Sequence, residues 1–177
     1  MHTDFYTVKE AKEQEYRNYI NEHIKNVQTT FKNLVSCKDI IEYLQSETWD
    51  PLYLPGLSNS IKEHDISKFG PYEFDQYRKE YYPVNDEEKQ ANKKDYDEAW
   101  IHHYTINKHH WDSWKTCPDL MPMNCVIEML CDWFAMSIKF GGKTTDWYNK
   151  QKDIVLGVNQ QRVVEKVMQM YGEKFES

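Results

Sequence analysis

Imidazole and carboxylate side chains gather in four segments of the sequence, and these groups suit the binding of a metal ion. The first is the dipeptide His64-Asp65, which lies in a helix that we predict over SIKEHDISKF (60–69). On a helix this pair shares one face with Ile61 and Lys68, because residues three, four and seven positions apart lie on the same side. That face would present an imidazole, a carboxylate and an ammonium together. A packed histidine beside a surface salt bridge is the alternative interpretation.

Two further segments place polar groups on apolar helix faces. His23 lies between Ile20 and Val27 on the apolar side of a predicted helix, where a histidine bonded within the core is the commoner case. Glu128 and Asp132 lie one turn apart in the most apolar segment of the chain. Burying an unpaired carboxylate is costly, so both acids need a cation or donors nearby. A metal ion would satisfy both, and a lysine or arginine is the alternative.

The fourth segment, WIHHYTINKHHWDSW (100–114), holds two pairs of adjacent histidines. If its helix continues, His103, Asn107 and His110 share a face, since seven residues make nearly two turns. If the helix ends near Asn107, His109 turns inward instead. We favour His110 as a ligand, with His109 as its alternative or as a group that contacts the substrate. A surface cluster of histidines is the remaining interpretation.

Together the four segments predict six metal ligands and one supporting acid. Nitrogen and oxygen ligands in this mixture suit Fe, Mn, Co, Ni or Zn rather than Ca or a thiolate cluster. Six ligands exceed what one ion needs when water and substrate also bind, so we expect one or two divalent ions, with Asp65 as the bridge of a binuclear site. Glu128 would accept the N–H of a ligating histidine. The predicted ligands are His23, His64, Asp65, His103, His110 and Asp132, with His109 as the alternative to His110.

Helices are expected to position all of these residues. Apolar residues recur at three- and four-residue steps, and only 6 Gly and 6 Pro interrupt the chain. We predict a loop over 48–59, in which Ser58 or Asn59 caps the helix that carries His64, and Gly70-Pro71 closes that helix. The fold is predicted to be all-α, one domain over 1–177 with seven or eight helices. The other helices are predicted over 8–34, 37–46, 71–82, 86–107, 121–140, 144–156 and 158–172.

Composition excludes several classes of protein. The net charge of −7, from 22 basic and 29 acidic residues, argues against nucleic acid as the main partner. No run of 18 apolar residues predicts a membrane-spanning helix, and the first residues, MHTDFYTVKEAKEQ, predict no secretory signal. The four cysteines form no CxxC pair. We therefore expect reduced thiols and a cytoplasmic location.

The order H…HD…D on an all-α chain resembles the HD-domain superfamily of metal-dependent phosphohydrolases. His23, His64, Asp65 and Asp132 match its core pattern one by one. HDISK (64–68) is similar to the HDIGK that opens many of these sites, which implies that Lys68 faces a phosphate.

The binuclear branches of that superfamily, including the HD-GYP phosphodiesterases, have two further histidines before the last aspartate. His103 and either His109 or His110 match this insertion. No GYP follows the histidine pair, and the pair lies only six or seven positions after His103. A cyclic dinucleotide substrate is therefore not carried over to this chain.

Three longer segments resemble more closely an uncharacterised family found in phages and bacteria. Its pattern is HI…V, HDxSKF…EF…Y, WxxHxxxNxHH and EMxxDW, and the resemblance spans residues 20–148. This resemblance implies a location in the cytoplasm of a bacterium, or of the host cell if the protein is phage-encoded. It implies no particular activity. The matching segments are HDISKFGPYEF, WIHHYTINKHHWDSW and MPMNCVIEMLCDWFAMSIKFGG.

The wider resemblance implies a phosphohydrolase that acts on a nucleotide or another small phosphoester. Asp65 and Lys68 would be catalytic, and Lys68, Asn107 and His109 would contact the substrate. Two alternatives stay open: a di-iron oxygenase of the HD type with a similar ligand set, and a non-catalytic module that binds and sequesters a nucleotide. A homo-oligomer is compatible with each of them.

Overall fold

The computed structural model describes residues 2–47 and 53–176, and within them the chain is all-α, as predicted. These residues form eight α-helices and three short 3₁₀ turns, and no strand. The chain divides into two compact units, each built from two stretches of sequence. The first unit comprises Met1–Glu22 and Asp65–Asn107, and the second comprises His23–His64 and Lys108–Ser177. The expectation of one domain over 1–177 stays a prediction.

The longest helix, α1 (His2–Ser36), contributes its first part to the first unit and the rest to the second. It was predicted over 8–34 from its apolar periodicity. The side chains that carry this periodicity, Tyr16, Ile20, Val27 and Leu34, are all at most 1% exposed. Burial of one apolar stripe therefore stabilises a helix whose other faces are charged.

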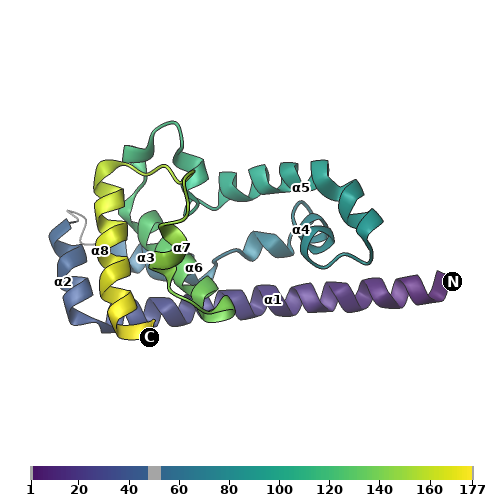
Figure 1. Cartoon of the computed structure of the whole chain (residues 1–177), viewed down its shortest axis with the longest axis horizontal. Coiled ribbons are helices and arrows are strands. Elements are labelled where there is room, and N and C mark those ends of the chain that lie inside the picture. The colour runs from purple at the N-terminus through teal and green to yellow at the C-terminus, as the bar shows by residue number, and fades with distance from the viewer. Residues whose placement is uncertain (1, 48–52, 177) are drawn as a thin grey trace. The chain divides into compact units, whose positions relative to one another are not determined.

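In the first unit, α4 (Phe74–Tyr81) packs against α5 (Asp86–Ile106) and the 3₁₀ turn η1 (Ile66–Phe69) (Figure 1). Asn85 caps α5, because its side-chain oxygen accepts a hydrogen bond of 2.8 Å from the backbone N–H of Glu88. Three acidic residues in the first turn of α5 also stabilise this helix, because their negative charges lie near the positive end of its dipole. Both helices lie close to their predicted bounds.

Aromatic rings and one buried cation form the interior of the first unit. Tyr16 packs on Phe74 with ring centroids 5.2 Å apart. The guanidinium of Arg78 is completely buried and donates to both carboxylate oxygens of Glu88, at 2.7 and 2.8 Å, and to Asp75 at 3.0 Å. This ion pair joins α4 to the beginning of α5.

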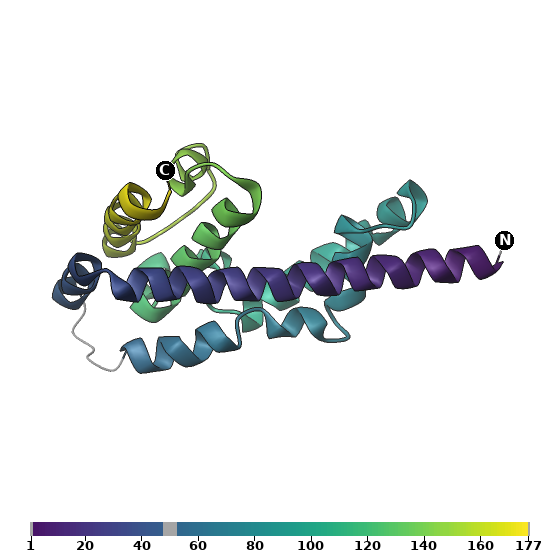
Figure 2. The same cartoon turned by 90° about the horizontal axis from the view of Figure 1, so that it is seen from below.

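In the second unit, α3 (Tyr53–Lys62), α7 (Thr144–Tyr148) and α8 (Val158–Phe175) contact α6 (Met123–Phe140), and α2 (Lys38–Glu47) packs on α8 (Figures 1 and 2). Every residue from 125 to 131 is buried, as expected for the most apolar segment. Gly141 ends α6 with a φ of 77°, which favours glycine. None of the described helices is both long and apolar enough to cross a membrane.

The predictions around His64 were wrong in their local structure. Residues 53–59 belong to α3 rather than to a loop, so Ser58 and Asn59 lie inside the helix, and residues 48–52 lie outside the described part. The chain leaves the helix after Lys62, and His64 and Asp65 form a turn before η1. The reason is that Asp65 has a left-handed backbone (φ 54°), which a right-handed helix excludes. No single helical face therefore carries this pair together with Ile61 and Lys68.

The helix predicted over 144–156 is also shorter than expected, since α7 ends at Tyr148. An irregular segment follows and ends at Gly157, which directly precedes α8. A Cβ at Gly157 would clash with Asp119 in the 3₁₀ turn η3 (Pro118–Leu120). The residue that precedes α8 therefore has to be a glycine.

The buried Arg78 generates a testable prediction on stability. Arg78→Ala leaves Glu88 without its main cation, and removing one partner of a buried pair costs about 3–5 kcal/mol of unfolding free energy. Urea denaturation at pH 7 measures the loss. The matched control Lys93→Ala removes a side chain that is 78% exposed, and we expect stability close to that of the wild type.

The loss of stability in Arg78→Ala should depend on pH. Hydrogen bonds from Arg78 hold the pKa of Glu88 below its usual range. A lowered carboxyl pKa stabilises the fold above the unfolded pKa of about 4.3 and stops doing so as pH falls through the folded pKa. The stability gap between wild type and Arg78→Ala should therefore narrow below about pH 4. A gap that is constant from pH 7 to pH 3 would contradict this ion pair.

Candidate metal centre

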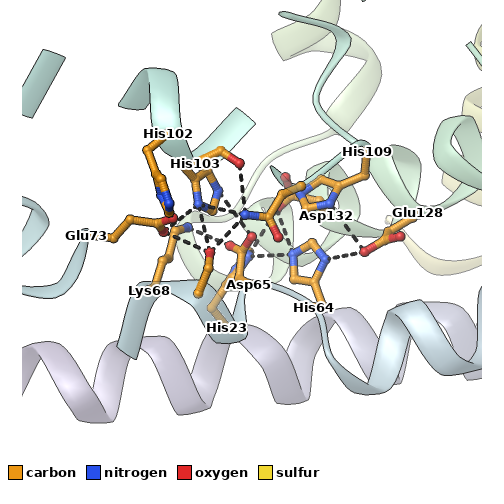
Figure 3. A network of polar contacts seen from close by, with 12 residues as sticks. His23, His64, Asp65, Lys68, Glu73, His102, His103, His109, Glu128 and Asp132 are labelled. Atoms are coloured by element: carbon orange, nitrogen blue, oxygen red, sulfur yellow. Dashed lines mark hydrogen bonds and ion pairs between the residues drawn. The ribbon is translucent and has the colours of Figure 1, made fainter. Parts of the chain in front are cut away.

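Three predicted ligands of the second unit come together: His23 from α1, His64 from the turn after α3, and Asp132 from α6. His23 Nε2 lies 3.1 Å from Asp132 Oδ1 and 3.3 Å from His64 Nε2. His64 Nε2 lies 3.9 Å from Asp132 Oδ1. The three side chains are 5%, 0% and 14% exposed, respectively. Figure 3 shows these groups with their contacts.

The spacing of these three atoms fits a shared ion. Two ligand atoms about 2.0–2.2 Å from one ion, at an angle of about 90–110°, are about 2.8–3.6 Å apart. Two of the three pairs lie within this range, and the third exceeds it slightly. Two imidazole nitrogens and a carboxylate oxygen form a common ligand set for first-row divalent ions. His23, His64 and Asp132 therefore fit such an ion.

Glu128 contacts the other nitrogen of His64. Its Oε1 lies 3.0 Å from His64 Nδ1 and 3.3 Å from His109 Nδ1 (Figure 3). Burial raises the pKa of Glu128, but the hydrogen bonds of His109 and His64 outweigh it and lower the pKa to about 2. A carboxylate accepts, so these contacts assign the Nδ1 proton to His64 and leave the Nε2 lone pair toward His23 and Asp132.

The choice between His109 and His110 depended on a helix that does not continue. α5 ends at Ile106, and Asn107 is already extended (φ −96°, ψ 92°), so His103 and His110 share no helical face. The Trp114 indole N–H donates to the carbonyl of Lys108 at 2.8 Å and holds the turn that follows. Which of the two histidines is a ligand stays a prediction.

The two histidines differ clearly in their surroundings. His109 is only 2% exposed, and its ring centroid lies 4.4 Å from that of His64. His110 is partly exposed and packs on His109 at 4.2 Å. His109, His64 and Glu128 also lie close enough together to hold an ion. A neutral imidazole has one lone pair, so His64 serves either this set or the set with His23 and Asp132.

In the first unit, His103 lies between two buried carboxylates. Its Nε2 is 3.2 Å from Asp65 Oδ1, and its Nδ1 is 2.7 Å from Glu73 Oε2. Lys68 Nζ contacts the second oxygen of Asp65 at 2.6 Å. Burial lowers the pKa of His103, but the carboxylates of Asp65 and Glu73 raise it above its ordinary value. His103 thus contacts both buried carboxylates, and Lys68 contacts one of them, Asp65.

Further hydrogen bonds hold this arrangement in place. Glu73 accepts from Ser67 Oγ at 2.9 Å. It also accepts from His102 Nδ1 at 2.8 Å (Figure 3). The side-chain amide of Asn107 donates to Ser67 Oγ and to the carbonyl of His103, both at 2.9 Å. Asn107, predicted to contact substrate, therefore also closes the end of α5. The predicted substrate contact is a separate matter and stays a prediction.

Sequence reasoning missed Glu73, which is completely buried. Helical spacing gave one indication of its burial. Glu73 lies four positions before Tyr77, so both would lie on the same buried face of a helix. The break at Gly70-Pro71 concealed that Glu73 directly precedes α4. Its partners Ser67 and His103 come from other elements, so their contacts with Glu73 do not follow from local periodicity.

Each unit thus repeats the same local arrangement around one histidine. A glutamate contacts Nδ1 and an aspartate lies near Nε2: Glu128 and Asp132 for His64, Glu73 and Asp65 for His103. Carboxylates at the remote nitrogen are the usual partners of metal-binding histidines. The expectation that Asp65 bridges two ions stays a prediction.

The charges around His103 predict its titration in metal-free protein. Its pKa should lie above the ordinary value of about 6.5, and Asp65→Asn should lower it because the strongest stabilising charge is removed. Imidazole ¹⁵N NMR over a pH series measures both. The control Asp75→Asn removes a carboxylate that binds Arg78 instead, so the pKa of His103 should stay the same. A pKa at or below about 6.5 for wild-type His103 would contradict these contacts with the two carboxylates.

Comparison with protein-family models matches residues 12–172 to one described as a family of unknown function, DUF5662. The match includes every predicted ligand of both units. Comparisons with curated proteins and with solved structures found no match.

Proposed function

Because the chain belongs to the DUF5662 family, whose function is unknown, we propose a function from its own residues. We infer that it is a metal-dependent phosphohydrolase that acts on a nucleotide or another small phosphoester, as the HD-type order of its ligands implies. The observation that carries this proposal is the buried group of His23, His64 and Asp132, with Glu128 at the remote nitrogen of His64.

These residues would hold a divalent ion of the Fe, Mn, Co, Ni or Zn type. Such an ion lowers the pKa of a bound water to about 7 and stabilises negative charge that develops on phosphorus. Asp132 supplies a negative ligand, and His23 and His64 supply neutral nitrogens. Glu128 keeps the proton of His64 on Nδ1, so that Nε2 stays available as a ligand.

Lys68 is the candidate for holding a phosphate oxygen. Its side chain is 15% exposed, and its ammonium lies against the carboxylate of Asp65, a predicted ligand. In the first unit, the raised pKa of His103 means that a proton must leave before Nε2 can bind an ion. Metal affinity at His103 should therefore increase with pH.

A second candidate function is an iron-dependent oxygenase. Two histidines and one carboxylate are also the ligands of non-haem iron(II) oxygenases, and His23, His64 and Asp132 have this composition. Oxygen consumption by the iron-loaded protein, together with an iron spectrum, would favour this activity. Turnover of a phosphoester with colourless Mn or Zn would favour hydrolysis.

The proposed activity is tested by metal analysis followed by a substrate screen. Protein purified without added metal is assayed with nucleotides and small phosphoesters under each of the five divalent ions. We expect metal-dependent release of phosphate, which Asp132→Asn abolishes together with the bound ion. Asp153→Asn, an exposed carboxylate of the same unit, is the control and should retain both. Tight nucleotide binding without turnover at full metal loading would instead support the sequestering module.

Glu128→Gln should weaken metal binding by about 10–100-fold, because the amide replaces the charged acceptor at His64 Nδ1. Titration of metal-free protein with Mn²⁺ or Zn²⁺ measures the affinity. Glu165→Gln, on the exposed side of α8, is the matched control. If Glu128→Gln keeps the affinity of wild type, Glu128 has only a structural role.

Lys68→Ala should separate substrate binding from metal binding. An ammonium is no metal ligand, so the ion content should stay constant, whereas kcat should fall by about 10²–10³ as one preorganised donor is lost. Asp65→Asn should lower ion content and turnover together. Lys62→Ala, an exposed lysine at the end of α3, serves as control. Loss of metal in Lys68→Ala, or an unchanged kcat, would count against this role.

A further inference from the structure

Two tyrosine hydroxyls are buried in the first unit without a hydrogen-bond partner. Tyr16 on α1 is 1% exposed and Tyr77 on α4 is 4% exposed. Within residues 2–47 and 53–176, no partner lies in hydrogen-bonding range of either hydroxyl. Buried side-chain hydroxyls in native proteins nearly always have a partner, because an unpaired one is unfavourable. A pair of them therefore points to a bound molecule that completes their hydrogen bonds.

Both hydroxyls lie among the charged groups of the first unit. Burial raises the pKa of both phenols above their usual range, and the carboxylates of Asp65 and Glu73 raise them further. Tyr16 packs on Phe74 with ring centroids 5.2 Å apart, and Phe74 lies one helical turn before Tyr77 on α4, so Tyr16 lies on the side of α4 that carries Tyr77. A phenol hydroxyl is a hydrogen-bond donor, so each of the two can donate to an acceptor.

The ring of Tyr77 lies near both Lys68 and His103. Its ring centroid lies 5.6 Å from the ammonium of Lys68 and 5.6 Å from the ring centroid of His103. The carboxylates Asp65 and Glu73 already accept from Lys68, His103 and other donors, shown in Figure 3. The two phenol hydroxyls are therefore further donors, and they form no hydrogen bond with these carboxylates.

The charge of this region decides which kind of acceptor fits. Asp65 and Glu73 are two buried carboxylates, and the ammonium of Lys68 lies 2.6 Å from Asp65 Oδ2. With a divalent ion at Asp65, the ion and Lys68 would together carry three positive charges against these two carboxylates, which favours an anion. A phosphate group offers several oxygens, each of which accepts more than one hydrogen bond.

We propose that the hydroxyls of Tyr16 and Tyr77, together with the ammonium of Lys68, bind the non-bridging oxygens of the substrate's phosphate group. This inference rests on the proposed phosphohydrolase function and adds two residues that position the substrate. Three donors around one phosphate would select phosphoesters over neutral substrates.

The test uses inorganic phosphate as the probe. Phosphate is titrated calorimetrically into the full chain saturated with Mn²⁺, for wild type, Tyr16→Phe and Tyr77→Phe. Each variant should raise the Kd for phosphate about ten-fold or more, because hydrogen bonds to charged groups are the stronger kind. Tyr81→Phe is the control, since Tyr81 is 58% exposed and its hydroxyl contacts Tyr96. Its Kd should match that of wild type.

Stability separates this role from a structural one. Phenylalanine removes a hydroxyl that has no partner in the chain, so both variants should unfold at the wild-type temperature or above it when metal and phosphate are absent. A clear fall in Tm would show that the hydroxyl has a structural partner, such as an ordered water, and would overturn the inference.

The remaining outcomes distinguish the inference from the proposed function. If wild type binds phosphate and hydrolyses phosphoesters, while the phenylalanine variants do both equally well, the inference fails and the function stands. If wild type neither binds phosphate nor releases it from any phosphoester, both fail. Weaker phosphate binding at unchanged stability supports the assignment of both tyrosines.

Discussion

A buried glutamate at the Nδ1 atom of an inward-facing histidine is the interaction on which the rest of the site depends. Glu128 occupies this position for His64, and Glu73 occupies it for His103. The contact sets the orientation of the ring and the nitrogen that carries the proton, and it thereby determines what Nε2 can bind. Each glutamate also needs its histidine, because a buried carboxylate without a partner is unstable. The same contact thus orients the imidazole ring and stabilises the buried carboxylate.

The two units differ in how they balance charge. In the first unit, the buried carboxylate of Asp65 contacts the ammonium of Lys68. In the second unit, Glu128 and Asp132 contact imidazole nitrogens of His64 and His23. A divalent ion held by His23, His64 and Asp132 would add positive charge beside both carboxylates of the second unit.

Sequence periodicity predicted the helices that carry His23 and Asp132, because their ligands lie on apolar faces that had to be buried. It did not predict the turn at Asp65, since a left-handed residue leaves no periodic signal. The position of His109 was uncertain for a related reason, because a hydrogen bond beyond the helix fixes the turn in which it lies. Glu73 was missed because its two histidine partners, His102 and His103, lie 29 and 30 residues away in the sequence. Composition and spacing thus identified candidate ligands, whereas the contacts that support them required the fold.

X-ray absorption spectroscopy at the metal edge, on protein carrying one equivalent of the ion it retains, tests this metal centre most directly. We expect two imidazole nitrogens and a carboxylate oxygen at about 2.0–2.2 Å, with the imidazole signal reduced in His23→Ala. Protein that retains no ion, or an ion whose spectrum lacks imidazole ligands, would contradict a metal centre at His23, His64 and Asp132.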